Sequence, residues 1–238
     1  TMFVAPKGSK LVSIDYSQIE FRILAHFAKE KALIEAFKHG EDVHAVTAAK
    51  LFNKDIKKVD SNDRRFAKTI NYGIAYGMES FGLSQRLEIE PGEAKAMLED
   101  YWSTFSNIRK YLDKVVVDVN KKGYTETLFG RRRYYAGITS TNAHVRMADE
   151  RAAMNAPTQG SAADIFKLAM IETAKIVEEY DEDVKMTLTV HDELVFEVKN
   201  ELVEEVSKKL VAAMENVVEL DVPLTVDVGV GPNWAEAK

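Results

Sequence analysis

The sequence predicts an α+β fold, in which a small antiparallel sheet carries a large, mostly helical insertion. Strand-like segments occur near both ends of the chain: LVSID near the start, and KMTLTV, LVFEV and PLTVDVGV near the end. Helical periodicity fills most of the region between them. The early strand is therefore expected to pair with the late hairpin and the final strand.

The first strand is expected at residues 11–15, where a short apolar run ends in an acidic residue. Ser17 and Glu20 have the spacing of a capping box, which predicts that a helix begins there. Helical periodicity then covers three stretches, at about 18–51, 62–76 and 92–121.

The second half of the chain is expected to alternate between short strands and helices. Three glycines punctuate a segment of short strands and turns: Gly123, Gly130 and Gly137. A long helical region over about 142–180 is expected to be interrupted near Pro157 and Gly160, because proline lacks the N–H that a helix needs. The remaining predicted elements are strands at 185–190 and 194–198, a helix at about 201–218 and a final strand at 223–230.

The composition, with 46% hydrophobic and 29% charged residues among 238, is that of an ordinary globular protein. No apolar run approaches the length of a membrane span and no signal peptide opens the chain, so we expect a cytoplasmic location, in a bacterial or viral host cell or an organelle. The absence of cysteine excludes disulfides, thiolate metal sites and cysteine nucleophiles. A net charge of −6 argues against binding polyanions through the overall field, although basic residues cluster locally.

Two carboxylates that are far apart in sequence are expected to meet at one edge of the sheet. Asp15 ends the first strand, and Asp192 lies at the tip of the hairpin TLTVHDELVFEV. Two adjacent carboxylates repel unless a proton or cation separates them, and Mg²⁺ binds with few protein ligands plus waters and substrate phosphates. Two such ions can stabilise both oxygens of an in-line phosphoryl transfer. The alternatives are a solvated turn for Asp192 and a helix-start residue for Asp15.

The segment RRFAKTINYGIAYG predicts a helix with one face suited to a triphosphate. Arg64, Lys68 and Tyr72 are spaced four apart and share a face, with Tyr76 one step further round. The cations can hold phosphates, and Tyr72 can lie against a sugar or base. His44 can add a phosphate contact from a neighbouring helix. The alternative is an amphipathic helix with a charged face and half-buried tyrosines.

A third polar pattern lies in ERAAMNAPTQGSAAD, where Arg151, Asn155 and Gln159 are again spaced four apart. The residues between them are small, which permits close approach by another polymer. Arginine and amide side chains can bind the minor-groove acceptors that all correctly paired bases present in similar places. Helix capping and turn bonding around Pro157 is the alternative.

These residues resemble a known family. DYSQIEFR at 15–22, RRFAKTINYGIAYG at 64–77 and VHDELV at 190–195 resemble motifs A, B and C of family A DNA polymerases, the bacterial DNA polymerase I class. ERAAMNAPTQGSAAD resembles that family as well, and the resemblance covers essentially the whole chain. It implies template-directed DNA synthesis, by nucleotidyl transfer from a dNTP to a primer 3′-hydroxyl with two Mg²⁺ ions, for which Mn²⁺ can substitute.

The resemblance also implies domains and partners. The palm would comprise residues 1–30 and 123–238, and the helical fingers residues 31–122. The expected partners are primer–template DNA and dNTPs, with no membrane. In the family, a thumb, the first part of the palm and an exonuclease domain lie upstream of motif A, whereas this chain starts just before that motif. An upstream portion of the same or a companion chain is therefore expected, and the isolated chain should polymerise weakly or not at all.

The resemblance assigns roles to individual residues. Two carboxylates and a backbone carbonyl bind metal: Asp15, Asp192 and Tyr16. Three side chains grip the triphosphate: Arg64, Lys68 and His44, of which Lys68 also protonates the departing pyrophosphate. Four further residues surround the nucleotide: Gln18 and Tyr72, and the pair Glu20 and Tyr76, which closes the sugar pocket against a ribose 2′-hydroxyl. Four residues contact DNA: Arg151, Asn155 and Gln159 along the minor groove, and His191 beside the primer end.

Two positions depart from the family pattern. Tyr72 stands where phenylalanine is usual, and members with tyrosine there accept dideoxynucleotides more readily, because the phenol replaces the missing 3′-hydroxyl contact. Phe21 stands where leucine is usual, which predicts a change in packing.

Two rival functions remain. A single-subunit RNA polymerase shares the palm and a related fingers helix, but Glu20 beside Tyr76 argues against an enzyme that uses ribonucleotides. A nucleic-acid-binding or assembly module, derived from a polymerase and without activity of its own, is the non-enzymatic alternative.

Overall fold

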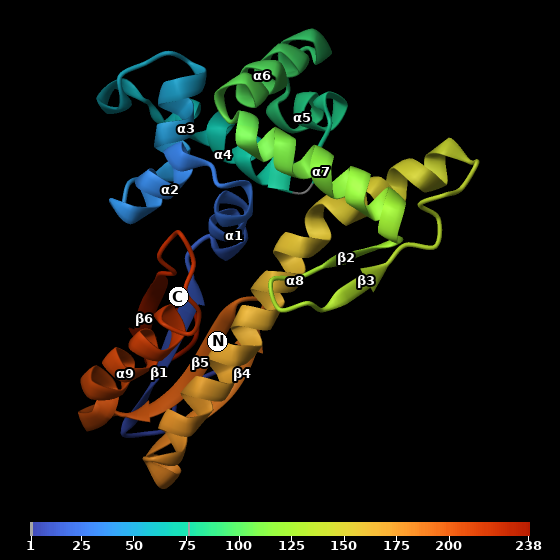
Figure 1. Ribbon diagram of the computed structural model, residues 1–238. Coiled ribbons are helices and arrows are strands. Elements are labelled where there is room, and N and C mark those ends of the chain that lie inside the picture. Colours follow the sequence, from blue (N-terminus) through green and yellow to red (C-terminus); the bar gives the residue numbers. More distant parts are fainter. Residues whose placement is uncertain (1, 76) are drawn as a thin grey trace. The chain divides into compact units, whose positions relative to one another are not determined.

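The computed structural model describes residues 2–75 and 77–238 (Figure 1). The chain divides into two compact units, one of Thr1–Ile19 with Ala162–Lys238 and one of Glu20–Ser161. The palm and fingers ranges stay a prediction, because compactness does not by itself assign these functional subdomains.

The first unit is built on a four-stranded antiparallel sheet with the order β4-β5-β1-β6. Its strands are β1 (Ser9–Tyr16), β4 (Val184–Val190), β5 (Glu193–Lys199) and β6 (Val226–Gly231). The early strand thus lies between the late hairpin and the final strand, which confirms the predicted pairing and the α+β fold. Most of β1 is buried, as expected of a central strand.

Helix α9 (Val203–Glu215) packs against the sheet. Its buried residues Val206, Leu210 and Met214 are four apart, so they form one apolar stripe toward β1, β5 and β6. The segment after β6 also lies close to the sheet: a Cβ at Gly229 would meet the carbonyl oxygen of Ala237 at 1.9 Å. Glycine is therefore required there for the last residues to pack against β6.

The second unit is mostly helical (Figure 1). It contains α1 (Ile19–Ala28), α2 (Lys31–Lys38), α3 (Val43–Leu51), α4 (Ser61–Ala75), α5 (Ser80–Leu87), α6 (Pro91–Thr104) and α7 (Ser106–Lys122), and a small β2–β3 hairpin (Tyr124–Glu126, Arg132–Tyr134). Helix α8 (Ala143–Glu178) contributes residues to both units. Short 3₁₀ turns occur at Ile56–Lys58, Asp181–Asp183 and Asn200–Leu202.

Several helix boundaries differ from the sequence prediction. The stretch 18–51 forms three helices, which are separated near Lys29 and Gly40, both with positive φ. Helix α1 begins at Ile19, because Gln18 has a φ of 57° and cannot form the helical backbone that a capping box from Ser17 requires. Helix α5 was not predicted.

The predicted interruption near Pro157 and Gly160 is wrong, because α8 continues through both residues. The Ala-rich sequence around them favours helix enough to outweigh a proline penalty of about 3 kcal/mol. Ser161 stabilises this point of the helix: its hydroxyl donates to the carbonyl of Pro157 at 2.6 Å and accepts from the backbone N–H of Leu128 at 2.8 Å.

None of the helices in the described part of the chain is long and apolar enough to cross a membrane.

Tyr16 links β1 to α9, since its buried hydroxyl donates to the carbonyl of Met214 at 2.6 Å. Burial raises the pKa of Tyr16, so the hydroxyl remains a donor. We expect Tyr16→Phe to lower the free energy of unfolding by about 1–2 kcal/mol, because the carbonyl in the last turn of α9 then lacks a partner. Urea unfolding measures this change.

Tyr180→Phe is the matched control, since its hydroxyl donates to Glu205 at 2.7 Å on the surface and its loss should change stability by less than about 0.5 kcal/mol. Equal losses in the two variants would contradict a structural role for the Tyr16 hydroxyl.

Candidate active site

The tip of the β4–β5 hairpin lies beside the end of β1. In the register of the sheet, Asp15 is opposite Glu193, and the backbone N–H of Tyr16 donates to the carbonyl of Asp192 at 3.3 Å. Burial, followed by the negative charges of Asp192 and Glu193, raises the pKa of Asp15 to about 6. The two carboxylates predicted from sequence, Asp15 and Asp192, are therefore brought together as neighbours that repel each other.

His191 precedes Asp192 in the two-residue turn and has a φ of 56°. A positive φ at the first of two central residues is typical of a type II′ turn, a position where glycine is usual. A histidine there is exposed at the tip of the hairpin, and its backbone carries strain of about 1 kcal/mol or more. The turn keeps this residue despite the strain, which favours a functional reason for the side chain.

Glu193 is held by three partners that sequence reasoning missed. Its carboxylate accepts hydrogen bonds from Ser13 at 2.5 Å and from the indole of Trp234 at 2.6 Å, and lies 3.2 Å from the ammonium of Lys238. Burial alone would raise the pKa of Glu193, but the donors Ser13 and Trp234 and the charge of Lys238 outweigh it and lower the pKa. The charge of Glu193 is therefore compensated within the protein, whereas those of Asp15 and Asp192 are not compensated in the same way.

The carboxylate pair fits a hard divalent cation. One carboxylate oxygen of Asp15, Oδ1, is buried and has no hydrogen-bond partner in the part of the chain that the structure describes. Within the described ranges, no cluster of three or more His, Asp or Glu side chains could hold a metal ion by itself. Two carboxylates without further side-chain ligands suit Mg²⁺, which retains waters and binds substrate phosphates.

Two predicted nucleotide-binding residues follow β1. Gln18 has a buried side-chain oxygen without a hydrogen-bond partner, and Glu20 lies half-buried in the first turn of α1. Tyr76 lies outside the described residues, so its predicted pairing with Glu20 stays a prediction.

In the second unit, α4 presents the predicted cationic face. Arg64 and Lys68 are exposed, and the ammonium of Lys68 lies 6.0 Å from the ring centroid of Tyr72. Arg64 pairs with Asp42, which also caps α3 by accepting from the backbone N–H groups of His44 at 2.9 Å and Ala45 at 3.3 Å. Asp42 thus fixes the arginine and the start of α3 together, a role that the sequence did not reveal.

His44 is almost completely buried, with 2% of its surface exposed. Its ring lies between Tyr72, at a centroid distance of 5.6 Å, and Phe21, at 6.5 Å. Burial lowers the pKa of His44 to about 4; Asp42 opposes this shift, whereas the charges of Arg64 and Lys68 add to it. His44 is therefore a neutral side chain beside two cations.

The polar stripe of α8 lies next to the turn that follows α4. A Cβ at Gly77, where φ is 68°, would lie 3.6 Å from the side-chain oxygen of Asn155 and 3.7 Å from the carbonyl of Arg151. That oxygen of Asn155 is buried without a hydrogen-bond partner, and Arg151 lies 3.6 Å from Glu79. Gln159 lines a cavity of about 160 Å³ together with Arg131, Arg132 and Arg133. Since the helix is not interrupted, the three stripe residues lie on one continuous helix.

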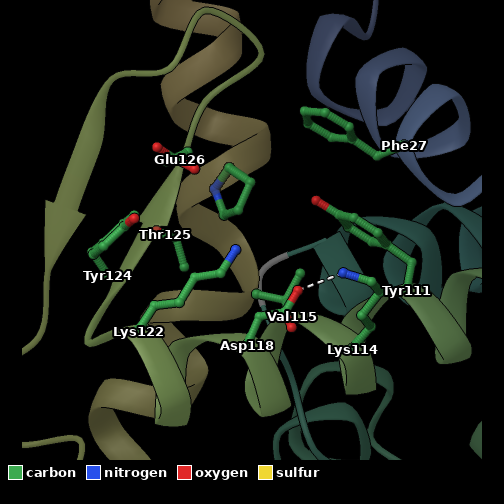
Figure 2. A pocket seen from close by; sticks show the side chains of 10 residues that line it. Phe27, Tyr111, Lys114, Val115, Asp118, Lys122, Tyr124, Thr125 and Glu126 are labelled. Carbon is green, nitrogen blue, oxygen red and sulfur yellow. Dashed lines mark hydrogen bonds and ion pairs between the residues drawn. The ribbon is translucent and has the colours of Figure 1, made fainter.

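A second cavity, of about 220 Å³, lies beside α7 (Figure 2). The rings of Phe27 and Tyr111 stack in its wall at 5.5 Å, and Lys114 pairs with Asp118. Among the predicted site residues that the structure describes, none lines this cavity. The candidate chemistry is therefore located at the carboxylate pair and on α4 rather than in this hollow.

Comparisons with known proteins agree on one family. The family model described as DNA polymerase family A matches residues 1–236. DNA polymerase I of Pseudomonas aeruginosa is 46% identical over 235 residues, which are 99% of this chain and 26% of that protein. DNA polymerase I of Streptococcus pneumoniae is 49% identical over 233 residues, 98% of this chain and 27% of that protein. The chain thus spans about a quarter of the length of these relatives.

A solved structure, the POL domain of Pol1 from M. smegmatis in complex with DNA primer-template and dNTP, superposes with a TM-score of 0.94 at 45% identity. The match covers 98% of this chain and 41% of that one.

The repulsion at the carboxylate pair gives a stability prediction. In EDTA at pH 8, Asp15→Asn should raise the free energy of unfolding by about 1 kcal/mol, a value that allows for the partial exposure of the carboxyl. Because the pKa of Asp15 is raised in the folded protein, ionisation of this carboxyl opposes folding from about pH 4 upward, and the loss of stability is complete above about pH 6. The gain in Asp15→Asn should therefore decline as the pH falls below about 6 and vanish near pH 4, and urea unfolding across this range measures it.

Glu193→Gln is the matched variant. It should destabilise the protein, because it removes a charge that Lys238 compensates. If Asp15→Asn instead lost as much stability at pH 8 as Glu193→Gln, Asp15 and Asp192 would not repel each other.

Proposed function

The chain belongs to DNA polymerase family A, and on this premise we propose that it is the palm and fingers core of a template-directed DNA polymerase. In this proposal it transfers a nucleotidyl group from a dNTP to a primer 3′-hydroxyl. The observation that carries the proposal is the meeting of Asp15 and Asp192 at the end of paired strands, with a carboxylate oxygen left unpartnered. The M. smegmatis structure, with primer-template and dNTP bound, supports the substrate class.

The carboxylates would hold two Mg²⁺ ions, for which Mn²⁺ can substitute, together with the backbone carbonyl of Tyr16. Such ions neutralise the developing charge on the attacking and leaving oxygens. The protein's own contribution is to fix Asp15 at the end of β1 beside Asp192 in the β4–β5 turn, so that the pair is assembled before substrate arrives.

The exposed face of α4 would bind the triphosphate. Arg64 and Lys68 supply positive charge, and His44 supplies a neutral donor. Lys68 would also protonate the departing pyrophosphate; its exposed ammonium, 6.0 Å from the ring centroid of Tyr72, supports contact with a ligand on this face. Tyr72 lies beside His44 and would contact the sugar. Gln18, Glu20 and Tyr76 would complete the nucleotide pocket, with the last two excluding a ribose 2′-hydroxyl.

The stripe on α8 would contact the primer–template duplex in its minor groove. Asn155 supports this role, because its buried oxygen has no hydrogen-bond partner among the described residues and can accept a hydrogen bond from a base or water. Arg151 and Gln159 extend the stripe by one turn on either side. His191, at the exposed hairpin tip, would lie beside the primer terminus.

The short length of the chain relative to its relatives favours an alternative, in which the isolated chain has no polymerase activity. Because it is about a quarter of their length, the palm and fingers would depend on an upstream portion that supplies a thumb. Without that portion the chain would be a polymerase-derived nucleic-acid-binding or assembly module with no activity of its own.

Primer extension tests the proposal. The chain is incubated with Mg²⁺, four dNTPs and a primed template, alone and joined to the upstream portion of a DNA polymerase I relative. We expect weak or no extension alone and clear extension by the joined protein, which Asp192→Asn should reduce by at least ~10²-fold. The control variant Asp183→Asn, an exposed carboxylate of the same unit, should retain activity.

Extension by the joined protein that survives Asp192→Asn would contradict the proposed site. Equal incorporation of rNTPs and dNTPs would instead favour an RNA polymerase.

Tyr72 gives a prediction on substrate choice. Tyr72→Phe should reduce ddNTP incorporation about tenfold relative to dNTP, because one hydrogen bond of about 1.4 kcal/mol is lost only where the substrate lacks a 3′-hydroxyl. Competition between ddTTP and dTTP in the joined protein measures the ratio. An unchanged ratio would show that the hydroxyl of Tyr72 does not contact the sugar.

A further inference from the structure

A series of hydrogen bonds runs from Thr47 on α3, through Asn71 on α4, to the ring of His44, which is also on α3. The hydroxyl of Thr47 donates to the carbonyl of Val43 at 2.7 Å. The same hydroxyl lies 3.4 Å from the side-chain oxygen of Asn71, but the bond to Val43 is much shorter, so the single hydroxyl hydrogen of Thr47 is assigned to the carbonyl of Val43. Toward any other neighbour, the oxygen of Thr47 therefore acts as an acceptor.

Asn71 on α4 is that neighbour. Its amide nitrogen lies 3.1 Å from the hydroxyl oxygen of Thr47 and 3.1 Å from Nδ1 of His44. The opposite amide orientation would place an acceptor against the lone pairs of Thr47, which is unfavourable. The amide nitrogen can only donate, so Nδ1 of His44 must accept and carries no hydrogen.

We propose that Asn71 is a positioning residue, which holds His44 in the neutral tautomer with its hydrogen on Nε2. This tautomer leaves one donor on the ring, and that donor would bind a phosphate oxygen of the incoming nucleotide. The inference rests on the proposed function for the identity of the ligand, but the tautomer itself does not depend on it.

Burial and charge agree with this assignment. Thr47, Asn71 and His44 are each at most 2% exposed, so water does not compete for their hydrogen bonds. The charged groups around the ring are Asp42 at the start of α3, and Arg64 and Lys68 on α4. Their combined effect with burial keeps the ring neutral near pH 7. The two cations then supply the charge at the phosphate site, whereas His44 supplies a directed donor.

The experiment reads the tautomer directly. The full chain, labelled with ¹⁵N-histidine, is studied by NMR without nucleotide, and His44→Gln identifies the His44 signals among the five histidines. We expect the nitrogen shifts of a bare Nδ1 and a protonated Nε2, unchanged from pH 8 to pH 6. A protonated Nδ1, or a mixture of the two tautomers, would overturn the inference.

Substitutions then test whether Asn71 is the cause. Asn71→Asp replaces the donor by an acceptor of the same shape, so the hydrogen should move to Nδ1. Thr47→Val keeps the shape but removes the acceptor that orients the amide, so both tautomers should appear. Asn120→Asp, an exposed amide on α7, is the matched control and should leave the signals unchanged. A ring that still has a bare Nδ1 in folded Asn71→Asp, or a single unchanged tautomer in Thr47→Val, would show that Asn71 does not set the tautomer.

Titration with dATP and Mg²⁺ separates this inference from the proposed function. A shift of the Nε2 signal that is larger than that of Nδ1 supports the phosphate contact. A shift confined to Nδ1 would overturn it. Absence of any dATP binding would contradict the proposed function, while the tautomer measurement would still decide the role of Asn71.

Discussion

The antiparallel pairing of β1 with β5 places three acidic side chains near one another, and the surrounding structure compensates Glu193 far more than Asp15. Glu193 receives Ser13, Trp234 and Lys238, so its charge is neutralised inside the protein. Asp15 and Asp192 are left as a pair that attracts a cation. A slip of one residue in the register would turn Asp15 to the opposite face of the sheet and separate the pair.

In the second unit the proposed binding face is positively charged, and neighbouring side chains hold its groups in place. Two of the three groups proposed to touch the triphosphate are oriented by a neighbour that does not touch it: Asp42 pairs with Arg64, and Asn71 bonds to His44. Asp42 also caps α3, so one carboxylate connects the helix that carries His44 with the helix that carries Arg64. Such support reduces the entropy lost when substrate binds, because the side chains are already in place.

The strand pairing, the carboxylates and the cationic helix face could be predicted, because alternation, periodicity and spacing are visible along the sequence. The partners of Glu193 could not, since Trp234 and Lys238 are distant in sequence and carry no pattern. Asn71 likewise sits on the buried side of α4, where an amide has no periodic signature. The continuous helix through Pro157 was not predicted, because the rule that proline interrupts a helix was outweighed by the helix-favouring residues around it.

The central position of β1 also bears on how the chain is made. Its contact with the hairpin joins residues 180 positions apart, as between Ser13 and Glu193, and its other neighbour, β6, is further along still. At roughly 5–20 residues per second, a ribosome would need about 10–40 s to add the residues between them. During that time β1 is an apolar strand with both edges unpaired, the kind of segment on which chaperones act and from which aggregation starts. The helical unit, whose contacts are more local, can fold in the meantime.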